Sequence, residues 1–73
     1  RNEFADALRV AQDLARERPD WPVALVIQGM ALEGMGKHKE ARAAYSQALA
    51  LEPGNVAALA GLRRAGAQKP TLY

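Results

Sequence analysis

Residues 22–55 read PVALVIQGMALEGMGKHKEARAAYSQALALEPGN, and this stretch decides the fold. It holds two helical patterns, separated at Gly36 and closed by Pro53-Gly54-Asn55. The first pattern is apolar on almost every side, as in a helix that several neighbours cover. The second is apolar along one side only, formed by Ala41, Ala44, Tyr45, Ala48, Leu49 and Leu51. The stretch therefore predicts two antiparallel helices joined by a short turn.

The same organisation recurs on both sides of this stretch at a constant spacing. Pro19 recurs as Pro53 (53 − 19 = 34), and Ala7 recurs as Ala41 (41 − 7 = 34). A constant spacing of about 20–50 residues indicates structural repeats that stack on one another. The second half of a unit thus precedes the full unit, and the first half of another unit follows it.

The full unit carries a pattern of small, aromatic and proline residues: Leu25-x2-Gln28-Gly29-x2-Leu32, then Ala41-x3-Tyr45, Ala48 and Pro53. This pattern resembles the tetratricopeptide repeat, W-x2-L-G-x2-Y…A-x3-F…P. Leu25, Gln28 and Leu32 depart from it, because they stand where the family has Trp, Leu and Tyr. The resemblance implies an all-α fold in which antiparallel helix pairs stack as a right-handed α-solenoid.

We expect one domain of four helices without strands. Residues 2–18 are the second helix of a preceding repeat, 22–55 the full repeat, 56–66 a first or capping helix, and 67–73 a tail. Asp20 is the expected cap of the second helix, and Asn55 that of the fourth. Arg63 stands where the full unit has Gly29 (63 − 29 = 34), and so long a side chain favours a helix that ends the stack.

Composition excludes several classes of partner and chemistry. The formal net charge is +2, with acidic and basic residues interspersed, which argues against a nucleic-acid partner and a helical RNA-binding repeat. A row of Arg1, Arg9 and Arg16 invites a phosphate-binding interpretation, but the acidic residues nearby favour a solvated helix face. The longest charge-poor stretch, 21–32, is too short to span a bilayer. The lack of cysteine excludes disulfides and is compatible with cytoplasm and periplasm alike.

No combination of residues predicts a catalytic, cofactor or metal site. His38 has no second histidine, cysteine or carboxylate cluster at ligand spacing, and Phe4 at the equivalent position indicates a packing role. Ser46 lies about two helical turns from His38, beyond hydrogen-bond reach. Glu33 and Glu40 belong to different helices, and nothing desolvates them predictably. We therefore interpret the chain as non-enzymatic and free of cofactors.

The resemblance implies a scaffold that binds a peptide or helix of a partner protein on the concave wall formed by the first helix of each pair. That wall, called the concave wall below, consists of Val23, Val26, Met30, Glu33, Ala57, Ala60 and Arg64. The family's clamp for a C-terminal carboxylate uses Lys, Asn and Arg, which Val26, Met30 and Ala60 do not match. A hydrophobic or helical ligand fits better. Trp21 is interpreted as a cover for the turn between units, with a binding anchor as the alternative.

A second hypothesis is a structural or oligomerisation segment that binds nothing along its groove. The helix over 2–17 resembles the second helix of a unit whose first helix is missing from the sequence. Its apolar stripe, with Phe4, Leu8 and Ala11 as the self-association residues, is then bare. We expect the isolated chain to bury it in a homodimer about a two-fold axis, the commonest symmetry, and a longer protein to cover it with a preceding helix.

Overall fold

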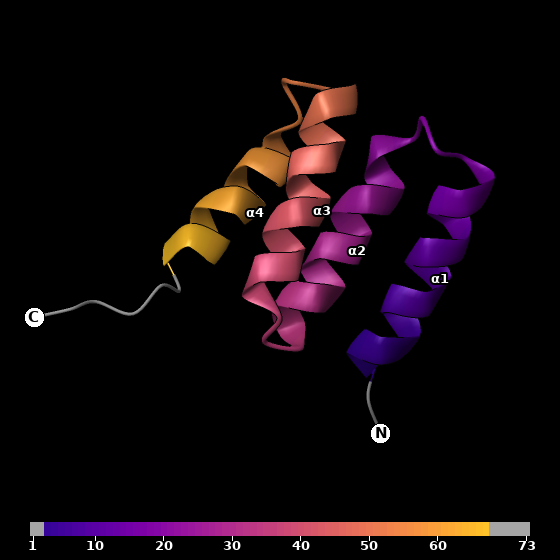
Figure 1. The fold of residues 1–73 in the computed structure, drawn as a ribbon, viewed down its shortest axis with the longest axis horizontal. Helices are drawn as coiled ribbons and strands as arrows, with labels where there is room; N and C mark the ends of the chain where they lie inside the picture. The colour runs from indigo at the N-terminus through magenta and orange to yellow at the C-terminus, as the bar shows by residue number, and fades with distance from the viewer. Residues whose placement is uncertain (1–2, 68–73) are drawn as a thin grey trace, which may run out of the picture.

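The computed structural model describes residues 3–67 and contains four helices within them. They are α1 (Glu3–Glu17), α2 (Pro22–Gly34), α3 (His38–Leu51) and α4 (Val56–Ala67), connected in that order (Figure 1). No strand occurs in this range. The expected all-α helical-repeat fold is confirmed. Of the expected tail, only Ala67 is described, as the last residue of α4, and the rest lies outside the described residues.

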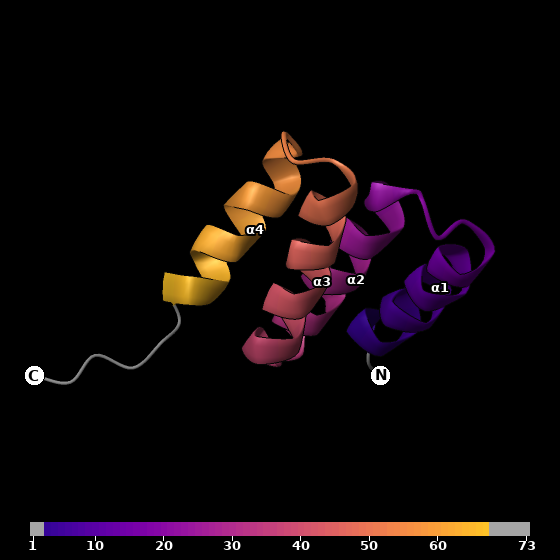
Figure 2. The same cartoon turned by 45° about the horizontal axis from the view of Figure 1, so that its top comes forward.

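The helices stack in sequence order, with α1 and α4 at the two ends and α2 and α3 between them (Figure 2). Each helix packs against the next one along the chain, and α2 also contacts α4. Across residues 3–67, α1 and α3 make no comparable contact. The stack therefore bends so that α2 and α4 approach each other on its inner side. The helices that carry the expected concave wall, α2 and α4, thus lie on this inner side.

The turn from α2 to α3 is set by one glycine. Gly36 has a φ of 80°, a left-handed conformation that glycine adopts without steric cost. The amide of Lys37 donates to the carbonyl of Leu32 at 2.9 Å, and the amide of Gly36 donates to that of Glu33 at 3.0 Å. These two bonds form a Schellman motif, which satisfies the last carbonyls of α2. The expected separation of the two helices at Gly36 is thus confirmed.

The two expected helix caps had different outcomes. Asn55 caps α4 as expected, since its Oδ1 accepts a hydrogen bond from the amide of Ala58 at 2.9 Å. The expectation for Asp20 was wrong, because the N-cap of α2 is Trp21 and makes no side-chain capping bond. Pro22 is the first helical residue and has no amide hydrogen to satisfy, so the need for a capping acceptor is reduced.

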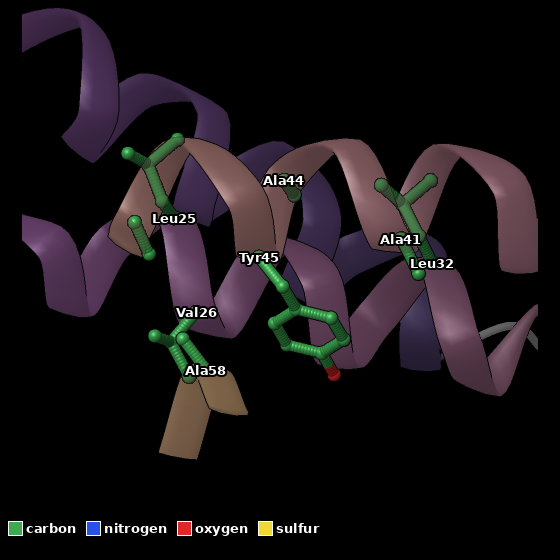
Figure 3. Close-up of a cluster of buried hydrophobic side chains, with 8 residues drawn as sticks. Leu25, Val26, Leu32, Ala41, Ala44, Tyr45 and Ala58 are labelled. Atoms are coloured by element: carbon green, nitrogen blue, oxygen red, sulfur yellow. The ribbon is translucent and has the colours of Figure 1, made fainter. Parts of the chain in front are cut away.

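Tyr45 is the centre of the core, and within residues 3–67 it is the only large side chain that is completely buried. The other members of the cluster come from α2, α3 and α4: Leu25, Val26, Leu32, Ala41, Ala44, Ala48 and Ala58 (Figure 3). The ring lies against two glycines, Gly29 of α2 and Gly61 of α4. A Cβ atom at Gly29 would lie 2.6 Å from Cε1 of Tyr45, closer than side chains tolerate. The three helices can therefore enclose the ring only because both facing positions lack side chains.

Candidate functional site

Most of the concave wall is accessible. Val23, Met30 and Ala57 are exposed, and Ala60 is half-buried. Val26 differs, because it is buried in the same core cluster as Ala58 of α4 (Figure 3). The sequence placed Val26 on the ligand-facing surface, whereas in the structure it packs α2 against α4. A ligand on the wall would thus meet Val23, Met30, Ala57 and Ala60.

The two charged residues of the wall are bonded to each other. Arg64 donates from Nε to Oε2 of Glu33 at 3.0 Å and from Nη2 to Oε1 at 3.1 Å. The hydroxyl of Tyr45 donates to Oε1 of Glu33 at 2.7 Å. Arg64 Nη2 also lies 3.5 Å from the Tyr45 hydroxyl. This Glu33–Tyr45–Arg64 network joins α2, α3 and α4 through a single carboxylate.

The network shifts the pKa values of its members in directions that its geometry explains. The hydrogen bond from Arg64 lowers the pKa of Glu33, with further lowering by the Tyr45 hydroxyl, against the opposing effect of burial. Burial, followed by the hydrogen bond to the Glu33 carboxylate, raises the pKa of Tyr45 to about 12. The carboxylate also raises the pKa of Arg64. At neutral pH the network therefore holds one cation, one anion and one neutral phenol.

Pairing within the network changes what the wall can recognise. The bidentate geometry of Arg64 on Glu33 is the one that an arginine would use toward a ligand carboxylate. Because Glu33 already occupies it, the wall offers apolar side chains beside a neutralised ion pair. Sequence reasoning named both residues but missed their pairing. The signal that could have found it is the opposite charge of two residues on adjacent first helices.

A second accessible feature is a groove between α1 and α2. This α1–α2 groove has a volume of about 290 Å³ and is lined by Phe4, Ala7, Ile27, Met30 and Ala31. Every lining residue is apolar. Met30, which is 52% exposed, belongs both to this groove and to the concave wall. A substitution at Met30 alone would therefore not distinguish the two surfaces.

The three self-association residues lie in different environments. Phe4 is half exposed, lines the α1–α2 groove, and packs part of its ring against Gly34 of α2. Leu8 is half-buried and packs against the core. Ala11 is completely buried and offers no surface to a partner. Because α2 packs along α1, the stripe expected to be bare is already partly covered.

The arginines of α1 and the Trp21 ring contact residues that are close to them in sequence. Arg9 and Arg16 form exposed ion pairs with Asp6 and Asp13, whereas Arg1 lies outside the described residues. The guanidinium of Arg18 lies 5.4 Å from the ring centroid of Trp21, which is half-buried.

The residues considered for chemistry are not brought together. His38 is half-buried, and its Nδ1 has no hydrogen-bond partner within residues 3–67. Ser46 and Glu40 are exposed on α3. The described residues contain no group of three or more histidines, cysteines and carboxylates that could hold a metal ion. In the same range, each helix is too short or too polar to cross a membrane.

Comparison with known proteins gives one family match and several longer relatives. Residues 22–55 match the sequence model of the tetratricopeptide repeat family. Tetratricopeptide repeat protein 28 of Homo sapiens is 38% identical over 52 residues, which are 71% of this chain and 2% of that protein. Hsp70-Hsp90 organizing protein of Triticum aestivum is 36% identical over 72 residues, 94% of this chain and 12% of that protein.

A third relative is the heat shock protein sti1 homolog of Schizosaccharomyces pombe. It is 36% identical over 61 residues, which are 84% of this chain and 10% of that protein. The chain thus spans between 2% and 12% of the length of the relatives described here. No solved structure matches it.

Proposed function

We propose, from the premise that this chain belongs to the tetratricopeptide repeat family, that it is a non-catalytic scaffold that binds a peptide or helix of a partner protein. Domains of this family generally mediate protein–protein interaction. The ligand would lie on the concave wall, where α2 and α4 approach each other. The observation that carries this proposal is the accessible apolar surface of Val23, Met30, Ala57 and Ala60 on those two helices.

The chemistry of the wall supports an apolar ligand. A helical segment that binds a groove does so through side chains spaced three to four residues apart, which apolar wall positions accommodate. A C-terminal carboxylate is a poor fit, because Arg64 is engaged by Glu33 at two atoms. To bind it, the ligand would have to displace the Glu33 carboxylate.

The test uses peptides selected for binding to this chain from a displayed library of amphipathic helices. Affinity is then measured for the wild type and for Met30→Glu and Ala57→Glu, two exposed wall positions on different helices. We expect each substitution to weaken binding at least about tenfold, since a carboxylate facing an apolar ligand must lose water without gaining a partner. Gln47→Glu, at an exposed position of α3, is the matched control for one added negative charge.

The pattern of losses locates the ligand. Loss in both wall variants supports the concave wall. Loss in Met30→Glu alone assigns the ligand to the α1–α2 groove, because Ala57 does not line it. Peptides that bind both wall variants as tightly as Gln47→Glu would refute the proposal, as would a selection that yields no binder.

The alternative function, a structural or oligomerisation segment, is favoured by a different observation. The α1–α2 groove has a volume of about 290 Å³ and is lined only by apolar side chains, which an apolar helix could cover. Circular dichroism and light scattering of the variants above separate the two functions. Substitutions that change only the state of assembly would favour the structural role.

A further inference from the structure

One face of α1 is exposed where the equivalent face of α3 is buried. Val10 and Ala44 occupy the same position in successive units (44 − 10 = 34), yet Val10 is 57% exposed and Ala44 is 3% exposed. The helix that follows cannot explain the difference, since α2 packs on α1 as α4 packs on α3. The helix that precedes can explain it, because α2 covers α3 and no described helix covers α1 in the same way. Val10 therefore marks the surface where a first helix would pack.

A matching exposed face occurs at the other end of the stack. Leu25 and Leu59 are also equivalent (59 − 25 = 34), but Leu25 is 9% exposed and Leu59 is 46% exposed. Leu25 is covered within the cluster that it shares with Ala44 and Ala48 of α3. In residues 3–67, α4 has no following helix to cover Leu59 in this manner. Leu59 therefore marks the surface where a second helix would pack.

The α1–α2 groove has the same position relative to α1 and α2 that helix α2 has relative to α3 and α4. Met30 lines the groove, and its equivalent is Arg64 (64 − 30 = 34), which is contacted by Glu33 of α2. By the same shift, groove residue Ala7 corresponds to Ala41, which is completely buried in the cluster with α2. The groove thus has the position and the apolar lining of a site for a first helix.

The exposed face of α1 would pack on a first helix, and the exposed face of α4 would pack on a second helix. The two faces are therefore those that meet within one helix pair. We propose that a second copy of this chain occupies the α1–α2 groove, with α4 of one copy packed against α1 and α2 of the next. In this arrangement α4 and the α1 of the next copy complete one unit. Leu59 and the next copy's Val10 then belong to one buried cluster, as Leu25 and Ala44 do within a single chain.

Arg63 does not prevent this packing. In the full unit, Gly29 is required because a Cβ there would meet the ring of Tyr45. The equivalent of Tyr45 on α1 is Ala11 (45 − 11 = 34), whose methyl group is already buried. Ala11 projects no ring toward the position of Arg63, so the aliphatic stem of Arg63 can lie along α1 while its guanidinium reaches water. Arg63 would therefore obstruct only a second helix that carries an aromatic residue at the position of Tyr45, and it does not by itself make α4 the end of the stack.

The proposed contact is heterologous, because it joins different surfaces of the two copies. Such a contact leaves α1 exposed at one end of the assembly and α4 at the other, so it continues beyond the dimer unless rotation closes a ring. It differs in this respect from the two-fold homodimer expected from the sequence, which would pair α1 with α1 and stop at two copies. A single helix seated in a groove is a small interface, so association is expected to be weak and concentration-dependent.

The test is sedimentation of the full chain over a range of concentrations, with Val10→Glu and Leu59→Glu as variants. Both positions are exposed, so circular dichroism should show folded proteins, and Gln47→Glu on α3 again controls for the added charge. We expect the wild type and Gln47→Glu to grow beyond dimers as concentration rises. Each variant alone should associate at least about tenfold more weakly, because it has lost one of the two faces. An equal mixture of the two variants should form a one-to-one dimer and stop, since each supplies the face that the other lacks.

Cysteine pairing gives an independent measurement that does not depend on disruptive substitutions. The chain has no cysteine, so Val10→Cys and Leu59→Cys each introduce a single thiol. Under mild oxidation, a mixture of the two should form the mixed disulfide faster than either variant pairs with itself.

Four results would overturn the proposal. The first is a wild type that stays monomeric at every concentration. The second is a Leu59→Glu variant that dimerises as strongly as wild type, and the third is a Val10→Glu variant that does the same. The fourth is an equal mixture of Val10→Glu and Leu59→Glu that fails to associate. The second result would establish the two-fold arrangement through α1. Preferred pairing of Val10→Cys with itself would establish the same arrangement.

Discussion

Alanine substitutions at two glycines of α4 should change stability in opposite directions. Gly61 and Gly66 lie five residues apart in one helix, and replacing glycine by alanine favours helix by about 0.5–1 kcal/mol in an interior position. A Cβ at Gly66 would have nothing within 4 Å, so Gly66→Ala should keep part of this gain near the helix end. A Cβ at Gly61 would overlap the ring of Tyr45. Overpacking of this kind costs about 1–3 kcal/mol.

The structure places the cost at Gly61 toward the upper end of that range. Gly29 holds the ring from the other side, and the Tyr45 hydroxyl is bonded to Glu33, so the ring has little freedom to move away. After the gain in helix propensity is subtracted, Gly61→Ala should destabilise by about 1–2 kcal/mol. For a domain of this size the melting temperature should fall by about 4–15 °C, whereas Gly66→Ala should raise it by a few degrees.

The assay is thermal unfolding followed by circular dichroism, at a concentration where the chain is monomeric. The control is Gly61→Ala in a Tyr45→Ala background. With the ring removed, the added methyl group should no longer destabilise, and the sign should match that of Gly66→Ala. The double-mutant comparison isolates the contact between the two positions. A Gly61→Ala protein that melts at or above the temperature of wild type would show that Gly61 does not accommodate the ring.

Three further predictions concern the Glu33–Tyr45–Arg64 network. Tyr45→Ala should cost about 3–5 kcal/mol, as truncations of large buried aromatics do, and a melting temperature within a few degrees of wild type would contradict the packing described. The pKa of Tyr45 is raised from 10.0 to about 12, so its contribution to stability should be present below pH 10 and lost between pH 10 and 12. In urea titrations Tyr45→Phe should lose less stability over that interval than wild type does, and equal losses would contradict the assignment. The pKa of Glu33 is lowered, so its contribution should be present above pH 4.5 and lost as the pH falls below that value. Glu33→Gln should flatten this acid limb, and an unchanged slope would mean that Glu33 is not the titrating group.

Helix existence and order could be predicted from the sequence because the signals are local or repeated. The two antiparallel helices expected within residues 22–55 are α2 and α3, and Asn55 and Gly36 act as expected, since caps and left-handed turns depend on near neighbours. The capping expectation for Asp20 was wrong, because Trp21 is the N-cap and Pro22 at the first helical position has no amide hydrogen to satisfy. The role of Val26 depends on how closely α4 approaches α2, which periodicity within one helix does not define.

The surfaces were less predictable than the fold for a related reason. The pairing of Glu33 with Arg64 joins residues 31 apart in sequence, and it follows from the bend of the stack rather than from any local pattern. Likewise, Ala11 looked bare when only its own helix was considered, but α2 leaves it no accessible surface. The constant spacing of 34 residues identifies which residues are equivalent in successive units, but it does not give their exposed fractions. Comparing the exposure of equivalent residues requires coordinates, and that comparison reveals the two unmatched faces.

The position of Tyr45 has a consequence for how an array containing this unit would unfold. In linear repeat proteins, stability is approximately a sum of intrinsic terms for each unit and coupling terms between nearest neighbours. One aromatic ring here contributes to both, because Gly29 belongs to its own unit and Gly61 to the next. Weakening the intrinsic term at this position therefore weakens the coupling as well. Partly unfolded arrays that end at this boundary should consequently be rare, and melting should extend across the boundary as a single event.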